Sequence, residues 1–140
     1  MSSCKRDCES LMSAVLPVAE RVLSEQRALG PFGSTLSIDD QLVQVGAGVS
    51  GGAFHVASRL TEFRNGFRDG ALRGELKGTA LVYTAQADDG GASAEVVRVE
   101  LDHRENYSII VSFPYHFTGA GELVIGDPFG AEGAHEIFEG

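Results

Sequence analysis

The chemical pattern that stands out in this sequence is a glycine-rich segment, Gly46 to Gly52, which contains the spacing G-x-G-x-x-G. This spacing resembles the phosphate-binding turn of flavin- and nicotinamide-binding proteins, where glycines let the backbone approach a pyrophosphate. That turn works inside a parallel β-α-β unit that carries an acidic residue roughly 20 positions further on. The next predicted strand ends instead in Gln86 and Ala87. We therefore expect a surface loop and no cofactor. A small ligand or nucleotide cofactor bound by this loop is the alternative.

Histidine and cysteine side chains are the next candidates, because they bind metals and carry protons near neutral pH. Two predicted strands bring together a set with mixed nitrogen and oxygen atoms, namely Glu100, Asp102, His103 and His116. The chain has no H-E-x-x-H or C-x-x-C spacing, however. Cys4 and Cys8 share a helical face, but two ligands near a fraying chain end make a weak metal site. We expect no metal.

Catalysis by a nucleophile or by paired carboxylates is not supported either. The segment Gly48 to Gly51 lacks the G-x-S-x-G spacing of a nucleophile elbow. The acidic pairs fall in predicted turns and in a polar tail, where carboxylates are normally solvated. These pairs are Asp39 with Asp40, Asp88 with Asp89, and Glu132 with Glu136. The sequence therefore predicts no catalytic residue.

Length and charge narrow the class of protein further. A chain of 140 residues is long enough for one domain. Its formal net charge of -9 opposes binding to nucleic acid and to anionic membranes, and favours a cationic protein as partner. No apolar stretch reaches the roughly 18 residues of a membrane span. Residues 1–13 lack the apolar stretch of a signal peptide, so we expect no export. With both cysteines at the N-terminus, we expect a cytoplasmic protein.

The elements that would position these residues begin with a helix and a hairpin. Apolar residues recur with helical period from about Asp7 to Leu29, although Pro17 should kink or restart this helix. Phe32 to Ile38 alternates, Asp39 and Asp40 supply a turn, and Gln41 to Val45 returns as a second strand. A second helix is predicted from about Phe54 to Leu72. Glycines at 66, 70 and 74 should weaken its end.

Three strands with short connections follow, at 79–87, 94–102 and 107–117. Short connections join antiparallel neighbours, so these strands should form a meander, with a short edge strand at 122–125. We predict a two-layer α+β domain of helix, hairpin, helix and three-stranded antiparallel meander, with both helices on one face of the sheet. Residues 1–6 and 127–140 should be irregular, the latter held by Phe129, Ile137 and Phe138. The predicted core contains Phe63, Phe67, Val99, Leu101, Val111 and Phe113.

This order of elements is similar to that of roadblock, profilin and PAS-like domains, which are mostly interaction or ligand-sensing modules. Segments 30–34 and 98–104, followed by Phe113-Pro114-Tyr115 and Gly121-Glu122-Leu123, resemble a family of small bacterial proteins of unknown function. That resemblance covers most of the chain from Gly30 onward. It implies no activity.

The remaining candidate site is a surface. The face of the meander turned away from the helices mixes apolar and charged side chains, and such a face can bind a partner or a second copy. We predict partner contacts at Val96, Arg98, Glu100, Ile110, Ser112 and His116. The favoured function is a non-enzymatic interaction module, in its narrower version an acidic neutralising partner of a basic protein.

Overall fold

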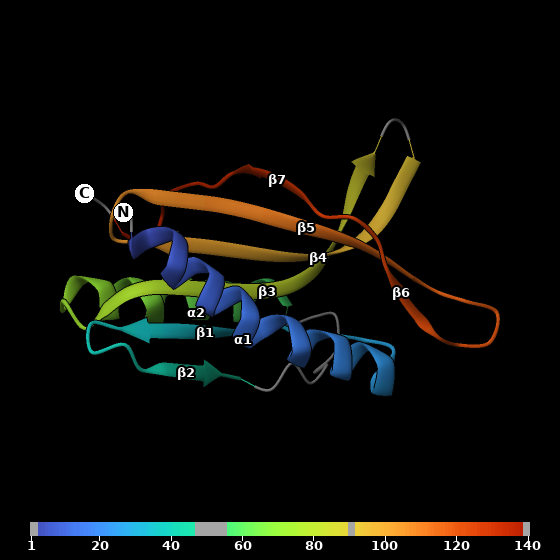
Figure 1. Cartoon of the computed structure of the whole chain (residues 1–140), viewed down its shortest axis with the longest axis horizontal. Coiled ribbons are helices and arrows are strands. Elements are labelled where there is room, and N and C mark those ends of the chain that lie inside the picture. The colour runs from blue at the N-terminus through green and yellow to red at the C-terminus, as the bar shows by residue number, and fades with distance from the viewer. Residues whose placement is uncertain (1–2, 47–55, 90–91, 139–140) are drawn as a thin grey trace.

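A computed structural model describes residues 3–46, 56–89 and 92–138 of the chain. It contains two helices, α1 (Ser3–Gln26) and α2 (Val56–Leu72). The strands are β1 (Phe32–Ser37), β2 (Leu42–Val45), β3 (Leu76–Asp89), β4 (Ala92–His103), β5 (Tyr107–Phe117), β6 (Leu123–Ile125) and β7 (Phe129–Glu132). The chain is therefore α+β, as its pattern predicts (Figure 1).

The strands form one antiparallel sheet of seven strands in the order β2-β1-β3-β4-β5-β6, with β7 also paired to β5. β3 is central, because it pairs with β1 on one side and with β4 on the other. β6 pairs with the end of β5 at residues 115–117, and β7 pairs with β5 at residues 109–112. The strand β7 lies in the tail that was expected to be irregular, so that expectation is wrong at Phe129–Glu132.

The two helices cover opposite faces of the sheet, and the prediction that both lie on one face is wrong. Ala80 and Val82 of β3 belong to the core beneath α1, whereas Leu81 and Tyr83 belong to the core with Phe67 of α2. Successive side chains of a strand point to opposite faces, so these two cores lie on opposite sides of β3. In Figure 1, α1 crosses the front of the sheet and α2 lies behind β3. The domain thus has three layers.

Helix α1 runs without interruption through Pro17, so of the two expectations, a kink or a restart of the helix, the restart is wrong. Its buried stripe follows the helical period and comprises Leu11, Val15, Ala19, Val22 and Leu23. Pro17 lies on the exposed side, where water can satisfy the carbonyl that loses its partner. The helix begins at Ser3, within the stretch that was expected to be irregular. It ends at Gln26 because Arg27 adopts a left-handed backbone with φ of 56°.

The predicted core residues lie inside, to different degrees. Phe67, Val99 and Leu101 are buried, while Phe63, Val111 and Phe113 are partly buried against the two cores. Neither α1 nor α2 has a stretch that is long and apolar enough to span a membrane.

Candidate functional site

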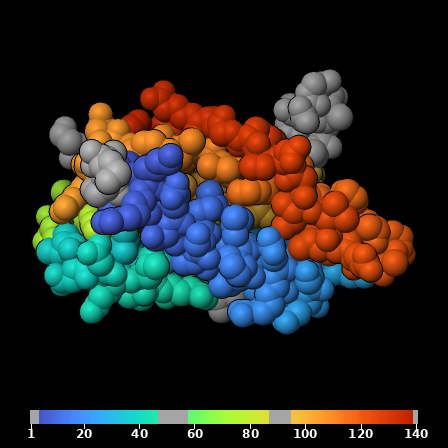
Figure 2. Space-filling view, in the orientation of Figure 1, coloured from blue at the N-terminus to red at the C-terminus, as the bar shows by residue number. Residues whose placement is uncertain are grey.

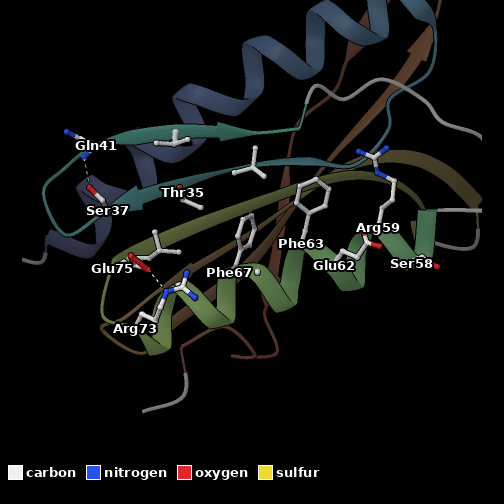
Figure 3. A pocket seen from close by; sticks show the side chains of 15 residues that line it. Thr35, Ser37, Gln41, Ser58, Arg59, Glu62, Phe63, Phe67, Arg73 and Glu75 are labelled. Atoms are coloured by element: carbon white, nitrogen blue, oxygen red, sulfur yellow. Dashed lines mark hydrogen bonds and ion pairs between the residues drawn. The ribbon is translucent and has the colours of Figure 1, made fainter.

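A groove of about 840 Å³ lies between α2 and the hairpin formed by β1 and β2 (Figure 3). One wall is the face of α2 that carries Phe63 and Phe67, and the other is formed by the strands. Val43 and Val45 of β2 make the strand side apolar, and Leu76 closes one end of the groove next to the last turn of α2. Ligand sites in proteins typically have volumes of about 300–1,000 Å³ and mostly apolar linings. The groove therefore has the size and lining of a binding site.

Glycines explain why α2 lies close to the sheet and why a hollow remains beside it. A Cβ added to Gly33 of β1 would lie 2.8 Å from the Phe67 Cζ, so this aromatic ring packs on bare backbone. At Gly70, an added Cβ would lie 2.7 Å from a methyl group of Leu76. At Gly66 it would meet nothing within 4 Å. Gly66 faces the groove, and the groove is open at that point because this position has no side chain.

Charged side chains surround the mouth of the groove. Arg73 and Glu75 form an ion pair of 2.5 Å at one end, and this pairing raises the pKa of Arg73. Arg59 and Glu62 lie along α2 toward the other end (Figure 3). Gln41 adds a polar group from the hairpin, where its backbone N–H donates to the Ser37 hydroxyl. The rim is therefore polar and mixed in charge, while the interior is apolar.

Sequence reasoning did not identify this groove. In the sequence, Gly66 and Gly70 predict only a weak end of the second helix. Gly66 and Gly70 are four residues apart, as are Phe63 and Phe67, and each phenylalanine precedes a glycine by three residues. When phenylalanines and glycines alternate along a helix in this way, the glycines allow close packing at one position and leave an unfilled space at another.

The predicted partner-binding face of the meander is the face on which α2 and the C-terminal tail pack. Val96 and Ser112 are buried there, so the expectation of a free face is wrong at these two positions. Arg98 and Ile110 are partly buried, and His116 is exposed. Ile137 of the tail is buried in the same core as Leu81 and Tyr83. The role of the six residues in partner contacts stays a prediction.

Glu100 is the sixth of these residues, and its carboxylate is already bound within the chain. Arg64 of α2 donates two hydrogen bonds to it, of 3.3 and 2.8 Å, and the Tyr83 hydroxyl donates a third of 2.5 Å. Burial and the bond to Glu100 raise the pKa of Tyr83 to about 12. The Glu100 carboxylate raises the pKa of Arg64 in turn. This cluster attaches α2 to β3 and β4.

Ser108 and Asp102 fix the tail on the same face. The Ser108 hydroxyl accepts the backbone N–H of His135 at 3.2 Å, and the Gly133 N–H donates to the Ser108 carbonyl at 3.0 Å. The hydroxyl also bonds to the Asp102 carboxyl, whose pKa is raised by burial. The imidazole of His135 lies 3.7 Å from Glu132. Serine, histidine and aspartate are near one another here, but they act as a clamp for the tail.

The expected set of Glu100, Asp102, His103 and His116 does not come together. His103 is 1% exposed and points to the α1 side of the sheet, where its Nε2 lies 2.8 Å from the Asp7 carboxylate. Its Nδ1 accepts the backbone N–H of Glu105, so Nε2 is the donor to Asp7. Among the described residues, no three His, Cys, Asp or Glu side chains are grouped as metal ligands.

Cys4 and Cys8 are part of α1 and are each 6% exposed, so they do not lie at a fraying end. Both are free thiols. Burial raises the pKa of Cys8 to about 12, and also raises the pKa of Cys4. Both side chains belong to the core beneath α1, and a raised pKa lowers the fraction that is present as the nucleophilic, metal-binding thiolate.

The glycine-rich segment starts at the end of the groove. Gly46 has a left-handed backbone with φ of 80°. A Cβ added at Gly46 would lie 3.0 Å from the Phe63 Cζ. Residues 47–52, which complete the G-x-G-x-x-G spacing, lie outside the described residues.

We compared the chain with family models, curated proteins and solved structures, and none of these comparisons found a relative. No family model matches the chain, and neither the curated proteins nor the solved structures include a significant match.

Proposed function

We propose that this chain is a non-enzymatic protein-interaction module, and that the groove between α2 and the β1–β2 hairpin receives an apolar segment of its partner. The observation that carries the proposal is the groove itself, about 840 Å³ in volume and floored by Val43, Val45, Phe63 and Phe67. Apolar surface gains about 25 cal/mol per Å² when it is removed from water. A partner that inserts apolar side chains here obtains that gain.

The charge of the chain supports a cationic partner. The formal net charge is -9, so a basic protein is attracted at long range and arrives faster. Around the groove, Glu62 offers a carboxylate at the rim, while the Glu75 carboxylate is paired with Arg73. Long-range charge would then set the rate of encounter, and the apolar groove would set how long the partner stays.

A small apolar ligand is the second candidate, and the volume of the groove favours it. Drug-sized molecules fit cavities of about 300–1,000 Å³ with a few polar groups for orientation. Thr35, Ser37 and Ser58 supply hydroxyl groups along the groove, and Arg59 supplies a cation.

Photo-crosslinking from the rim of the groove tests the proposal and separates the two candidates. Glu62 is exposed on α2 and is replaced with the photo-crosslinker p-benzoylphenylalanine in cells of the native host. Glu122, which is exposed in the turn between β5 and β6, receives the same substitution as a matched control.

A basic protein that crosslinks from position 62 through an apolar segment, and not from position 122, supports the proposal. A purified wild-type chain that retains a small molecule by native mass spectrometry, with no crosslinked protein, supports the second candidate and contradicts the first. Crosslinking to the same proteins from both positions contradicts the assignment of the groove.

A further inference from the structure

The sheet has two outer edges, and the edge along β5 is built to resist pairing with another chain. Ser112 and Tyr115 of β5 are three residues apart, whereas their pairing partners Phe129 and Ile125 are four residues apart. One extra residue therefore interrupts the pairing along this edge. The interruption contains Gly126 and Pro128. Irregular register, proline and charge, here that of Glu132 in β7, are the devices by which proteins protect edge strands.

The opposite edge, β2, has none of these devices. Its sequence is Leu-Val-Gln-Val, with no charged residue, proline or glycine. Leu42 is 45% exposed and Val43 51%, and Ile38 in the adjoining turn is 48% exposed. β2 ends the sheet, and no described residue pairs with its outer side.

The hairpin determines which backbone groups of β2 are available. The Ser37 N–H donates to the Gln41 carbonyl, and hydrogen-bonded pairs alternate along an antiparallel ladder. The groups of Val43 therefore face Thr35 of β1, its register partner. The N–H and C=O groups of Leu42 and Gln44 point away from the sheet. Such a row of unpaired N–H and C=O groups is a template for pairing with another strand.

We propose that two copies of this chain pair through β2, antiparallel, about a two-fold axis at Val43. In this register Leu42 of one copy lies opposite Gln44 of the other, and the outward backbone groups of both residues are satisfied. Val43 of one copy lies opposite Val43 of the other as the close, non-hydrogen-bonded pair. Most soluble homodimers use such a two-fold interface, in which each copy presents the same surface.

The charge on β2 itself does not oppose a second copy at this edge. β2 carries no charged residue, so two acidic chains can meet here without like charges facing each other on the paired strands. The same register places Asp40 beside Gly46 of the other copy, and the Asp40 carboxylate is already ion-paired with Lys77. The repulsion that remains comes from the net charge of -9 on each copy and acts at long range. Salt screens such repulsion.

Side chains on both faces of β2 add to the contact, because four residues alone supply few backbone bonds. On the α1 side, a hollow of about 510 Å³ lies beside Leu42, where a side chain of the second copy can be received. It is lined by the small residues Ser10, Ser13 and Ala14 and by one charged residue of each sign, Arg6 and Glu9. On the α2 side, Val43 lies at the groove, so pairing brings the two grooves together across the axis. The pairing needs no groove partner, and it stands or falls independently of the proposed function.

Sedimentation equilibrium of the purified chain tests the dimer. We expect a monomer–dimer equilibrium that shifts toward dimer when NaCl is raised from about 50 to 500 mM, since the screening length falls severalfold. Val43→Lys and Val43→Glu should each weaken the dimer roughly tenfold or more, because like charges then face each other on the axis. An equimolar mixture of the two variants should restore a mixed dimer, detected by native mass spectrometry.

The control is Val124→Lys on β6, an exposed valine (39%) on the protected edge, which should leave the dimer unchanged. Circular dichroism checks that all variants are folded. A wild type that stays monomeric at every salt concentration overturns the proposal. So does a dimer that tolerates Val43→Lys, or one that dissociates as salt is added, as binding to a basic chain would. Failure of the mixture to pair overturns the two-fold register.

Discussion

The ring of Phe67 lies directly on the backbone of Gly33, so that a Cβ at position 33 would come within 2.8 Å of the ring and 2.5 Å of the Ala80 carbonyl oxygen. This contact joins α2 to β1 and sets the depth of the groove. Neither neighbour can yield cheaply, because one is backbone and the other is a buried aromatic side chain that is 4% exposed.

Gly33→Ala should therefore destabilise the domain by about 1–3 kcal/mol, the usual cost of overpacking a core. Urea unfolding measures the change. Gly119→Ala is the matched control, since an added Cβ there meets nothing within 4 Å. Equal stability of the two variants would show that α2 does not sit on Gly33.

Asp102→Asn should make the domain more stable at pH 7. Burial raises the pKa of Asp102, so the folded state binds its proton more tightly than the unfolded chain does. A raised pKa gives stability that is present below the unfolded pKa of about 4 and is lost as the pH rises. The asparagine variant does not lose stability in this way as the pH rises, and its side-chain carbonyl can still accept a hydrogen bond from the Ser108 hydroxyl.

The advantage of Asp102→Asn over wild type should therefore shrink as the pH is lowered toward about 3 in urea unfolding. Asp39→Asn in the exposed hairpin turn is the control, and should change stability by less than about 0.5 kcal/mol. An asparagine variant that is less stable than wild type at pH 7 would mean that the ionised carboxylate is needed by the tail.

Tyr83 should make the domain sensitive to alkali. Its pKa is raised from the ordinary 10 to about 12, so the stability it contributes is complete below pH 10 and is lost between pH 10 and 12. Tyr83→Phe should reduce this fall, although not abolish it, because burial also raises the pKa of Tyr115 to about 12.

At neutral pH the same substitution should cost about 1.5–3 kcal/mol, since it removes a hydrogen bond to the Glu100 carboxylate. The free energy of unfolding measured at several pH values between 8 and 11.5 gives both quantities. An alkaline fall of unchanged size in Tyr83→Phe would assign that fall to other residues.

Except for β7, the strands could be predicted from the sequence, and their alternation explains why. The expected strand from Tyr107 to Phe117 is present as β5 with these bounds, and its apolar face packs on the α1 side through Ile109, Val111, Phe113 and Tyr115. The turn at Asp39 and Asp40 is also present, with Asp40 in a left-handed conformation. Period-two patterns and turn residues act locally, so a sequence carries them directly.

The sequence contains an indication that both faces of the sheet are covered. Residues 80–83 of β3 are four consecutive apolar side chains, and such a run is typical of a strand that is covered on both faces. The covering of Val96 and Ser112 could not be predicted in this way. Burial on this face depends on distant parts of the chain; for example, Ile137 of the tail is buried there with Leu81 and Tyr83.

The groove depends on the absence of a side chain at Gly66, and filling that position gives the most direct test of its role. We propose a fluorescence titration with the neutral apolar dye N-phenyl-1-naphthylamine on wild type, Gly66→Ala and Gly66→Leu. A Cβ added at Gly66 meets nothing within 4 Å, and both substitutions should raise the stability of α2 by up to about 1 kcal/mol, because glycine is a poor helix former. Wild type and Gly66→Ala should bind the dye equally, and Gly66→Leu should bind it at least roughly tenfold more weakly at an unchanged or higher melting temperature. Equal binding by all three proteins, or no binding by wild type, would contradict the claim that this groove is the binding site.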